Sequence, residues 1–530
     1  MNVWRGLIVA MLAVILGVPF VARRAAEQGR APTSAGARTL IVVSPHIQQI
    51  KSEFETAFNR WHQARWAQPV RIDWRYPGGT TEILNQLRSE FEARMRDGRI
   101  SADGRCQPGT IGFDVMMGGG SFEFGRLKRG VTMPAASLPR AGPSPGGADA
   151  SVTVPMSVPA GFSKEQLDEW YGANRIGAEV LYDPDQYWLG TALSAFGIVY
   201  NRDLLRDRGL PEPKTFVDLT SYQYRGLIAL ADPRQSGSVA TAYDSILNNR
   251  GWDEGWRILR EMSANARYFA TASTSPPFDV SQGEAAAGVA IDFYGRGQAQ
   301  AILRSGERPE DGRVGYVDPK GAAYIDADPV AILRGGPDPE LAKRFVEFCL
   351  SEEAQALWQF RARGSNEGGG PGDGLGPERY ELRRMPVRRI MYEKHLDRFV
   401  DRVNPFELAS ATAPRGWRDA IGPLMGAFGV DTSLELRAAW DALNAARSDA
   451  SFPPDVRAEM ERLFYAMPMH RTRDGREVPF SPESLKEIVA DTRRWTEPVH
   501  GTRSKIAYTK FFQCNYQRVA RCAHARSIVP

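Results

Sequence analysis

Small polar residues recur in this chain directly after short apolar runs, where a strand would turn into a helix. The four clusters are Ser44 with His46; Gly78, Gly79 and Thr80; Gly120 and Ser121; and Ser236, Gly237 and Ser238. Such turns leave backbone N–H groups unpaired at a helix N-terminus, and glycine lets a ligand approach the backbone. A single turn of this kind is also explained as a helix cap with no ligand. Their repetition indicates a binding site for an anion.

Motifs for catalysis are missing from the sequence. The six histidines include no His-x-His and no His-Glu-x-x-His pair, and there is no Gly-x-x-x-x-Gly-Lys loop and no Gly-x-Ser-x-Gly elbow. We therefore expect no catalytic residue, no metal site and no cofactor, and the chain is not predicted to be an enzyme.

The elements that would position these turns alternate between strands and helices. Strands are predicted at 39–43, 71–76, 113–117, 196–200, 227–231, 288–292 and 329–333, with a helix over about 340–360. Ser44 is predicted to cap the first helix, with Pro45 as its first residue. This alternation favours parallel sheets covered by helices, in which all such turns lie at the carboxyl edge.

Breaks in the pattern divide the chain. We expect a first lobe over 39–192, a second lobe over 193–322 and a return to the first lobe over 323–363. Residues 364–377 contain seven Gly and two Pro and are predicted to form a linker or exposed loop. A helical region over 378–500 and a basic tail over 501–530 would follow. The predicted fold class is α/β, two-lobed, with a helical C-terminal extension.

Charge is unevenly distributed. The first 40 residues carry +4 and the last 30 carry +6, so the 460 residues between them carry −6 of the total of +4. A nucleic-acid-binding body would need a basic stripe, which this balance does not support. We expect no nucleic-acid partner.

The N-terminus predicts export. Gly6 to Ala22 is a run of 17 uncharged residues that contains Pro19 and is flanked by arginines. Residues 1–30 are therefore a signal peptide or an N-terminal membrane anchor, two alternatives that stay open, and either places the body outside the cytoplasm.

The four cysteines are too few for a disulfide scaffold. Cys349 is predicted to be a core residue and Cys106 a free thiol. Cys514 and Cys522 are candidates for a disulfide in an oxidising compartment.

Several stretches resemble the type II periplasmic binding proteins, in the ferric-iron, polyamine and thiamine branch of the binding proteins of ABC importers. They are Ala195 to Asn201, Ala231 to Ser238, Gln282 to Ala285, Ala290 to Tyr294, Asp328 to Leu333, Pro339 to Phe348 and Leu350 to Gln355. The likeness covers residues 39 to about 360 and leaves the chain from Glu378 onward unexplained.

The resemblance implies a monomeric, extracytoplasmic solute-binding component that closes two lobes about a two-strand hinge and delivers its ligand to an ABC permease in the inner membrane. Trp188, Asp292 and Tyr294 join the turns above as expected ligand-binding residues. Iron binders of this branch use two adjacent tyrosines, whereas this chain has Phe293 and Tyr294. We therefore expect a small anionic solute, with iron only in association with one. The alternatives are a ligand-capturing domain of a membrane sensor, or an enzyme on the same lobes.

Overall fold

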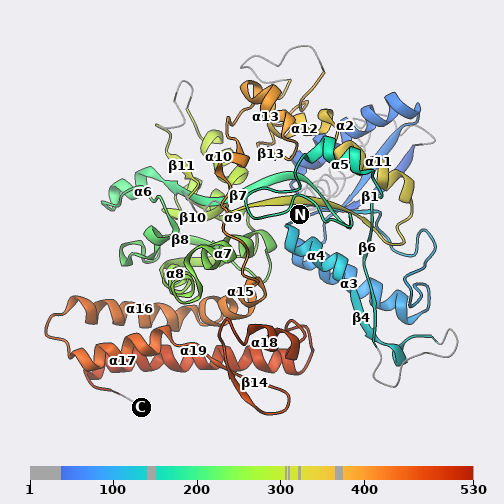
Figure 1. Ribbon diagram of the computed structural model, residues 1–530. Helices are drawn as coiled ribbons and strands as arrows, with labels where there is room; N and C mark the ends of the chain where they lie inside the picture. The colour runs from blue at the N-terminus through green and yellow to red at the C-terminus, as the bar shows by residue number, and fades with distance from the viewer. Residues whose placement is uncertain are drawn as a thin grey trace, which may run out of the picture.

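A computed structural model describes residues 37–139, 151–304, 307, 311–319, 324–363 and 374–528. Its centre is a mixed sheet in the order β2-β1-β3-β12-β7-β10-β8-β9. The first lobe is built on three parallel strands, β1 (Arg38–Val43), β2 (Val70–Arg75) and β3 (Val115–Met117). Its helices are α2 (Gln48–Trp66), α3 (Thr80–Arg96) and α4 (Ser121–Arg129), in blue and cyan in Figure 1.

The second lobe repeats this arrangement. Its parallel strands are β8 (Ile228–Ala231), β9 (Ala266–Ala270) and β10 (Ala287–Ile291). Its helices are α7 (Gly237–Arg250), α8 (Trp252–Asn265), α9 (Ser275–Gln282) and α10 (Asp292–Ala301). The predicted α/β class with a helical C-terminal extension is confirmed.

Two long antiparallel strands connect the lobes, β7 (Leu189–Asn201) and β12 (Ile325–Leu333), and every residue in both is buried. β7 pairs with β12 up to Ala195 and with β10 from Phe196 onward, so it passes from one lobe to the other. The sequence located only the more continuously apolar part of each strand, because most of the remaining residues of β7 and β12 are small or polar and interrupt the apolar run.

The predicted helix over 340–360 is two helices, α11 (Pro339–Cys349) and α12 (Glu352–Gln359). The Ser351 hydroxyl accepts a hydrogen bond from Ala354 N–H, which starts a new helix with a new axis. Cys349 is fully buried in the core, as predicted.

Residues 378–388, which we call the strap, run back across both lobes. The buried Glu53 carboxylate of α2 accepts hydrogen bonds from three successive backbone N–H groups, those of Glu378, Arg379 and Tyr380, at 2.6–3.0 Å. The short strand β13 (Met385–Pro386) then pairs with β7. The start of the predicted helical region is therefore extended, and it is part of the central sheet.

The C-terminal region packs beneath the second lobe (Figure 1). It contains α15 (Arg418–Met425), α16 (Ser433–Ser448), α17 (Pro454–Tyr465), the hairpin of β14 (Met469–Arg471) and β15 (Glu477–Pro479), α18 (Leu485–Asp491) and α19 (His500–Ala525). The segment described from sequence as a basic tail is helix α19, which packs against α16 and α17. Its buried face repeats every three to four residues, at Tyr508, Phe512, Tyr516 and Val519.

The proposed bridge between Cys514 and Cys522 is contradicted. Both residues lie on α19, where eight residues correspond to about 12 Å of rise, and a disulfide joins Cα atoms only about half as far apart. Cys514 is exposed and Cys522 is buried.

Among the described residues, no helix combines the length and the apolar character needed to cross a bilayer. The predicted export segment, residues 1–30, lies outside the described part of the chain, as does most of the predicted linker.

The packing of α19 predicts unequal effects of two substitutions on one helix. Phe512→Ala removes a ring that is 1% exposed and should lower the free energy of unfolding by about 3–5 kcal/mol. Ile506→Ala, at a side chain that is 51% exposed, should change it by no more than about 0.5 kcal/mol. Urea denaturation measures both values, and a similar small loss for the two variants would contradict the packing described here.

Candidate functional site between the lobes

The predicted turns from the two lobes meet at the interface between the lobes. A Cβ atom on Gly79 of the first lobe would lie 2.7 Å from the carbonyl oxygen of Gln235 in the second lobe. A Cβ atom on Gly237 would lie 2.7 Å from Glu123 Oε1 of α4. Because neither glycine has a side chain, the two lobes can approach each other closely at both positions.

Carboxylates of the protein itself occupy amides of the third turn. Gly119 N–H donates to Asp328 Oδ1 at 2.8 Å, and Ser121 N–H donates to Asp326 Oδ2 at 3.1 Å. Both aspartates lie on β12 and are almost completely buried. The anion that the sequence predicted beside Gly120 and Ser121 is, in this arrangement, a pair of internal carboxylates.

The two aspartates experience opposite environments. Burial raises the pKa of Asp326 to about 8, and the nearby carboxylates of Glu179 and Glu123 add to this effect. Burial would also raise the pKa of Asp328, but the charges of Arg384 and His46 outweigh it and hold that pKa below its ordinary value. The difference lies in the partners, because the residues are neighbours on one face of the same strand.

Arg384 of the strap inserts between the lobes. Its guanidinium forms an ion pair with Asp328, donates to the hydroxyl of Ser194 on β7 and lies 4.3 Å from the ring centroid of Phe293 on α10. His46 Nε2 is 2.9 Å from both Asp328 Oδ2 and Arg384 Nη1. One strap residue therefore joins the first turn, both connecting strands and the second lobe.

Arg418 of the C-terminal region makes a second connection. Its Nη2 donates to Glu123 Oε1 of the first lobe at 3.0 Å and to the Gly237 carbonyl oxygen of the second lobe at 2.9 Å. The guanidinium is mostly buried. The residues from 378 onward thus contact the interface between the lobes at two separate points.

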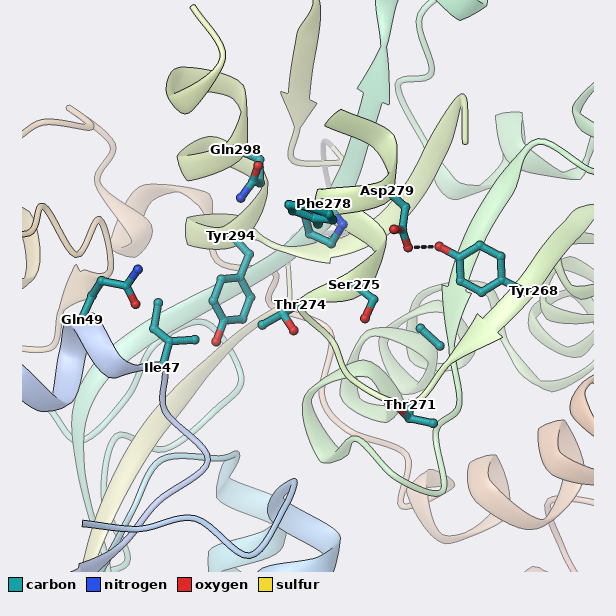
Figure 2. Close-up of a pocket in the computed structure, with 12 residues that line it drawn as sticks. Ile47, Gln49, Tyr268, Thr271, Thr274, Ser275, Phe278, Asp279, Tyr294 and Gln298 are labelled. Atoms are coloured by element: carbon teal, nitrogen blue, oxygen red, sulfur yellow. Dashed lines mark hydrogen bonds between the residues drawn. The ribbon is translucent and has the colours of Figure 1, made fainter. Parts of the chain in front are cut away.

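Beside this polar interface lies a cavity of about 530 Å³, shown in Figure 2. Ile47 and Gln49 at the start of α2 form one wall, and β9, α9 and α10 of the second lobe form the other. The second-lobe lining is Tyr268, Ala270, Thr271, Thr274, Ser275, Pro277, Phe278, Asp279, Tyr294 and Gln298. Tyr294 is the one predicted site residue in this lining, and burial raises the pKa of its phenol. The cavity is rich in hydroxyl and amide groups, and the Asp279 carboxylate already accepts a hydrogen bond from the Tyr268 hydroxyl.

Near the cavity wall, α2 carries a cation. Lys51 is not in the cavity lining, but it follows Ile47 by one helical turn and is only 6% exposed. Among the described residues, no carboxylate forms an ion pair with it. Its ammonium lies 4.7 Å from the ring centroid of Tyr76, and burial lowers its pKa. No described side chain caps the N-terminus of α2. This corner therefore has a positive charge and helix-end amides available to an anion.

The predicted cap of α2 is wrong. Ser44 Oγ accepts a hydrogen bond from His46 N–H at 3.1 Å, and Ser44 N–H extends the strand ladder by donating to Arg75. The His46 ring is held by Asp328, Ile47 has an extended backbone conformation, and the helix begins at Gln48. Ser44 is buried, and burial lowers the pKa of His46.

The other predicted residues have different surroundings. Trp188 packs in the apolar core of the first lobe and does not line the cavity. Thr80 is buried beside Gly119, and Gly78 stands against Glu82. Ser236 caps α7 through Val239 N–H, with Ser238 half-buried in the first turn of that helix. Asp292 is buried at the start of α10, and burial raises its pKa to about 7.

Sequence reasoning missed the charged residues that organise this interface, namely Glu123, Asp326, Asp328, Arg384 and Arg418. A signal existed on β12, because Asp326 and Asp328 are two apart in a strand and so lie on the same face. Nothing in the sequence pairs them with Arg384, which follows a long glycine-rich stretch.

The geometry is thus that of two α/β lobes joined by two strands, with a cavity between the lobes. Residues 164–363 match the family of bacterial extracellular solute-binding proteins. Over this segment the chain therefore resembles an extracellular solute-binding domain, in line with the resemblance found in the sequence.

Among curated proteins, the chain is 27% identical over 175 residues to the phosphoglycerate transport regulatory protein PgtC of Salmonella typhimurium, covering 32% of this chain and 40% of that protein. It is 28% identical over 168 residues to an uncharacterized protein of Haemophilus influenzae, covering 31% of this chain and 45% of that one. The chain thus spans less than half the length of these relatives.

Solved structures with a similar arrangement include the periplasmic binding protein AfuA of Actinobacillus pleuropneumoniae, at 17% identity and a TM-score of 0.44 over 61% of this chain and 82% of that one. The ferric binding protein of Campylobacter jejuni matches at 15% identity and a TM-score of 0.44, over 75% of this chain and 98% of that one.

The contrast between Asp326 and Asp328 predicts opposite pH profiles for two conservative variants. Between about pH 4 and pH 8 folded Asp326 retains a proton that the unfolded chain loses, so this group makes the protein less stable as pH rises. Asp326→Asn removes this pH-dependent fall in stability. The variant should therefore become more stable than wild type across this window, by a free energy of unfolding on the order of a few kcal/mol at pH 8.

Asp328→Asn is the matched control. It leaves Arg384 buried without its carboxylate and should cost about 3–5 kcal/mol at neutral pH. Because the folded pKa of Asp328 is depressed, that cost should shrink as pH falls below the ordinary carboxyl range. Chemical denaturation from about pH 2 to about pH 8 measures both profiles, and parallel profiles would refute the assignment.

Proposed function

We propose that this protein is the extracytoplasmic solute-binding component of an ABC-type importer, and that it captures a small anionic solute in the cavity between its lobes. The observation that carries this proposal is the cavity itself, whose walls come from both lobes of a fold that includes an extracellular solute-binding domain. Its volume of about 530 Å³ suits a small metabolite. No catalytic role is proposed for the lining residues.

The anionic class follows from Lys51 and the start of α2. A lysine that is nearly buried and lacks a carboxylate partner gains most from an anionic ligand, which would offset the cost of burying its charge. The uncapped α2 amides add donors suited to a phosphate or carboxylate. The name of the Salmonella relative, a phosphoglycerate transport regulatory protein, supports a phosphorylated organic acid as the first candidate.

The connecting strands suggest how capture would proceed. β7 and β12 are the long crossings in the described sheet, so we propose that the lobes rotate about them and that an ABC permease receives the closed form. Export of the protein from the cytoplasm would depend on residues 1–30, which would act as a signal peptide or as a membrane anchor.

A sensor domain is a second candidate, because Arg384 and Arg418 connect the interface between the lobes to the region from 378 onward. Such contacts would let that region respond to closure. Deletion of the gene distinguishes the two roles. Loss of uptake of a radiolabelled solute supports import, whereas intact uptake with a lost transcriptional response to that solute supports sensing.

The ligand class can be tested directly with purified protein. In a thermal shift assay, 3-phosphoglycerate should stabilise the protein, by about 2.7 kcal/mol at 100 times its Kd, whereas glycerate should have little effect. Native mass spectrometry of freshly purified protein would also reveal a retained metabolite.

Lys51→Met should abolish this stabilisation. The control is Lys343→Met, which removes another lysine that lies over an aromatic ring, 5.0 Å from the centroid of Phe162, on α11, where its ammonium already donates to the Gly161 carbonyl oxygen. If no phosphorylated or carboxylated metabolite stabilises the protein, or if Lys51→Met retains full stabilisation, the anionic assignment fails.

Direct binding of ferric ion is not expected. Tyr294 supplies one phenolate, its neighbour Phe293 supplies none, and the Arg384 guanidinium beside that ring disfavours a trivalent cation. Adding a ferric salt with a weak chelator should therefore produce no visible phenolate-to-iron band. A strong band that disappears in Tyr294→Phe would contradict this choice of ligand.

A further inference from the structure

Three potential metal ligands converge in the C-terminal region, outside the cavity lining. They are His470 on β14, Asp491 at the end of α18 and His500 at the start of α19. Asp491 Oδ2 is 2.9 Å from His470 Nε2 and 2.5 Å from His500 Nε2, and the three atoms lie within 4.8 Å of one another. The two histidines thus each direct one nitrogen, and Asp491 directs one oxygen, toward the same small region.

The surrounding contacts orient these ligands. His470 is fully buried, and its Nδ1 lies 2.7 Å from the hydroxyl of Tyr508 on α19. If Nδ1–H donates to that oxygen, the Nε2 lone pair faces Asp491 and His500. A hydrogen bond from the second ring nitrogen is the usual companion of a metal-binding histidine. Arg473 N–H holds the other carboxylate oxygen of Asp491 at 3.3 Å.

The backbone between Asp491 and His500 is unusual. Arg493, Arg494 and Trp495 are three successive non-glycine residues with φ of 46°, 55° and 55°. Left-handed conformations are costly for such residues and persist where surrounding contacts fix them. Here the Trp495 ring is buried against Phe480, and the turn returns the chain so that His500 faces Asp491.

We propose that His470, Asp491 and His500 bind a divalent transition-metal ion of the zinc class. Two imidazole nitrogens and one carboxylate oxygen are a set that zinc accepts in tetrahedral sites, whereas calcium and magnesium prefer oxygen ligands throughout. Asp491 and His500 are partly exposed, at 16% and 19% of their side chains, so water can complete the coordination. The ion would join the β14–β15 hairpin, α18 and α19.

The alternative is that Asp491 simply accepts hydrogen bonds from both imidazoles. That arrangement requires a proton on each Nε2, and the two lone pairs of Asp491 Oδ2 can accept both hydrogen bonds, so the metal titration below decides between the two arrangements. A divalent cation replaces both protons and satisfies all three groups together. The sequence predicted no metal site, because these residues are 21 and 9 positions apart and match no local motif.

Untagged, full-length protein treated with a chelator and then dialysed should bind one Zn²⁺ per chain in isothermal titration calorimetry. Zinc should also raise its melting temperature. Added Co²⁺ should give the intense visible bands of a tetrahedral site, a test that uses the wild-type protein alone.

His500→Gln should weaken zinc binding by more than the roughly 10- to 100-fold expected for Tyr508→Phe, which removes only an outer contact. His395→Gln is the matched control, because His395 contacts a single carboxylate, Glu352, at 2.8 Å, and it should bind zinc like wild type. The absence of stoichiometric binding in the wild type, or unchanged affinity in His500→Gln, would overturn the proposal. Neither result bears on the cavity between the lobes.

Discussion

Burial of the Asp328 carboxylate is the constraint on which the organisation of the interface between the lobes depends. The side chain is 1% exposed, and a charge in such a place is tolerated only with partners of opposite charge and hydrogen-bond donors. Those partners are His46 from the first turn, the Gly119 amide from the third turn and Arg384 from the strap. One carboxylate on a connecting strand therefore fixes two turns and a segment more than fifty residues further along the chain.

The strap makes the C-terminal region part of the binding-protein body. Glu53 holds its beginning, β13 adds it to the sheet beside β7, and Arg384 inserts between the lobes. The solute-binding domain recognised by comparison ends at residue 363, before the strap begins. The strap lies outside that match, yet it contributes the charge of Arg384 to the interface between the lobes.

Two different types of site for negative charge lie close together in this structure. At the third turn, the carboxylates of Asp328 and Asp326 accept the hydrogen bonds of the Gly119 and Ser121 amides, so these two amides are not available to a ligand. At the start of α2, the amides have no side-chain cap and Lys51 has no carboxylate partner among the described residues. The start of α2 is therefore the place where the proposed anion would find backbone donors without a side-chain cap.

The sequence by itself determined the fold class, because runs such as 39–43 and 288–292 and the stripes of the intervening helices are local patterns set by the alternation of apolar residues. The same local signals identified Cys349 as a core residue and the glycine turns as close approaches of backbone, whereas Tyr294 was placed in the cleft by the family resemblance. What required the tertiary structure was every property that depends on partners distant in sequence. The start of α2 lies at Gln48 rather than at Pro45, after a turn in which Asp328 holds the His46 ring, and the basic C-terminal segment became a buried helix because α16 and α17 cover its apolar face. Asp326 and Asp328 look alike in the sequence and differ in charge state because only one of them meets an arginine, and no local pattern encodes which arginine that is.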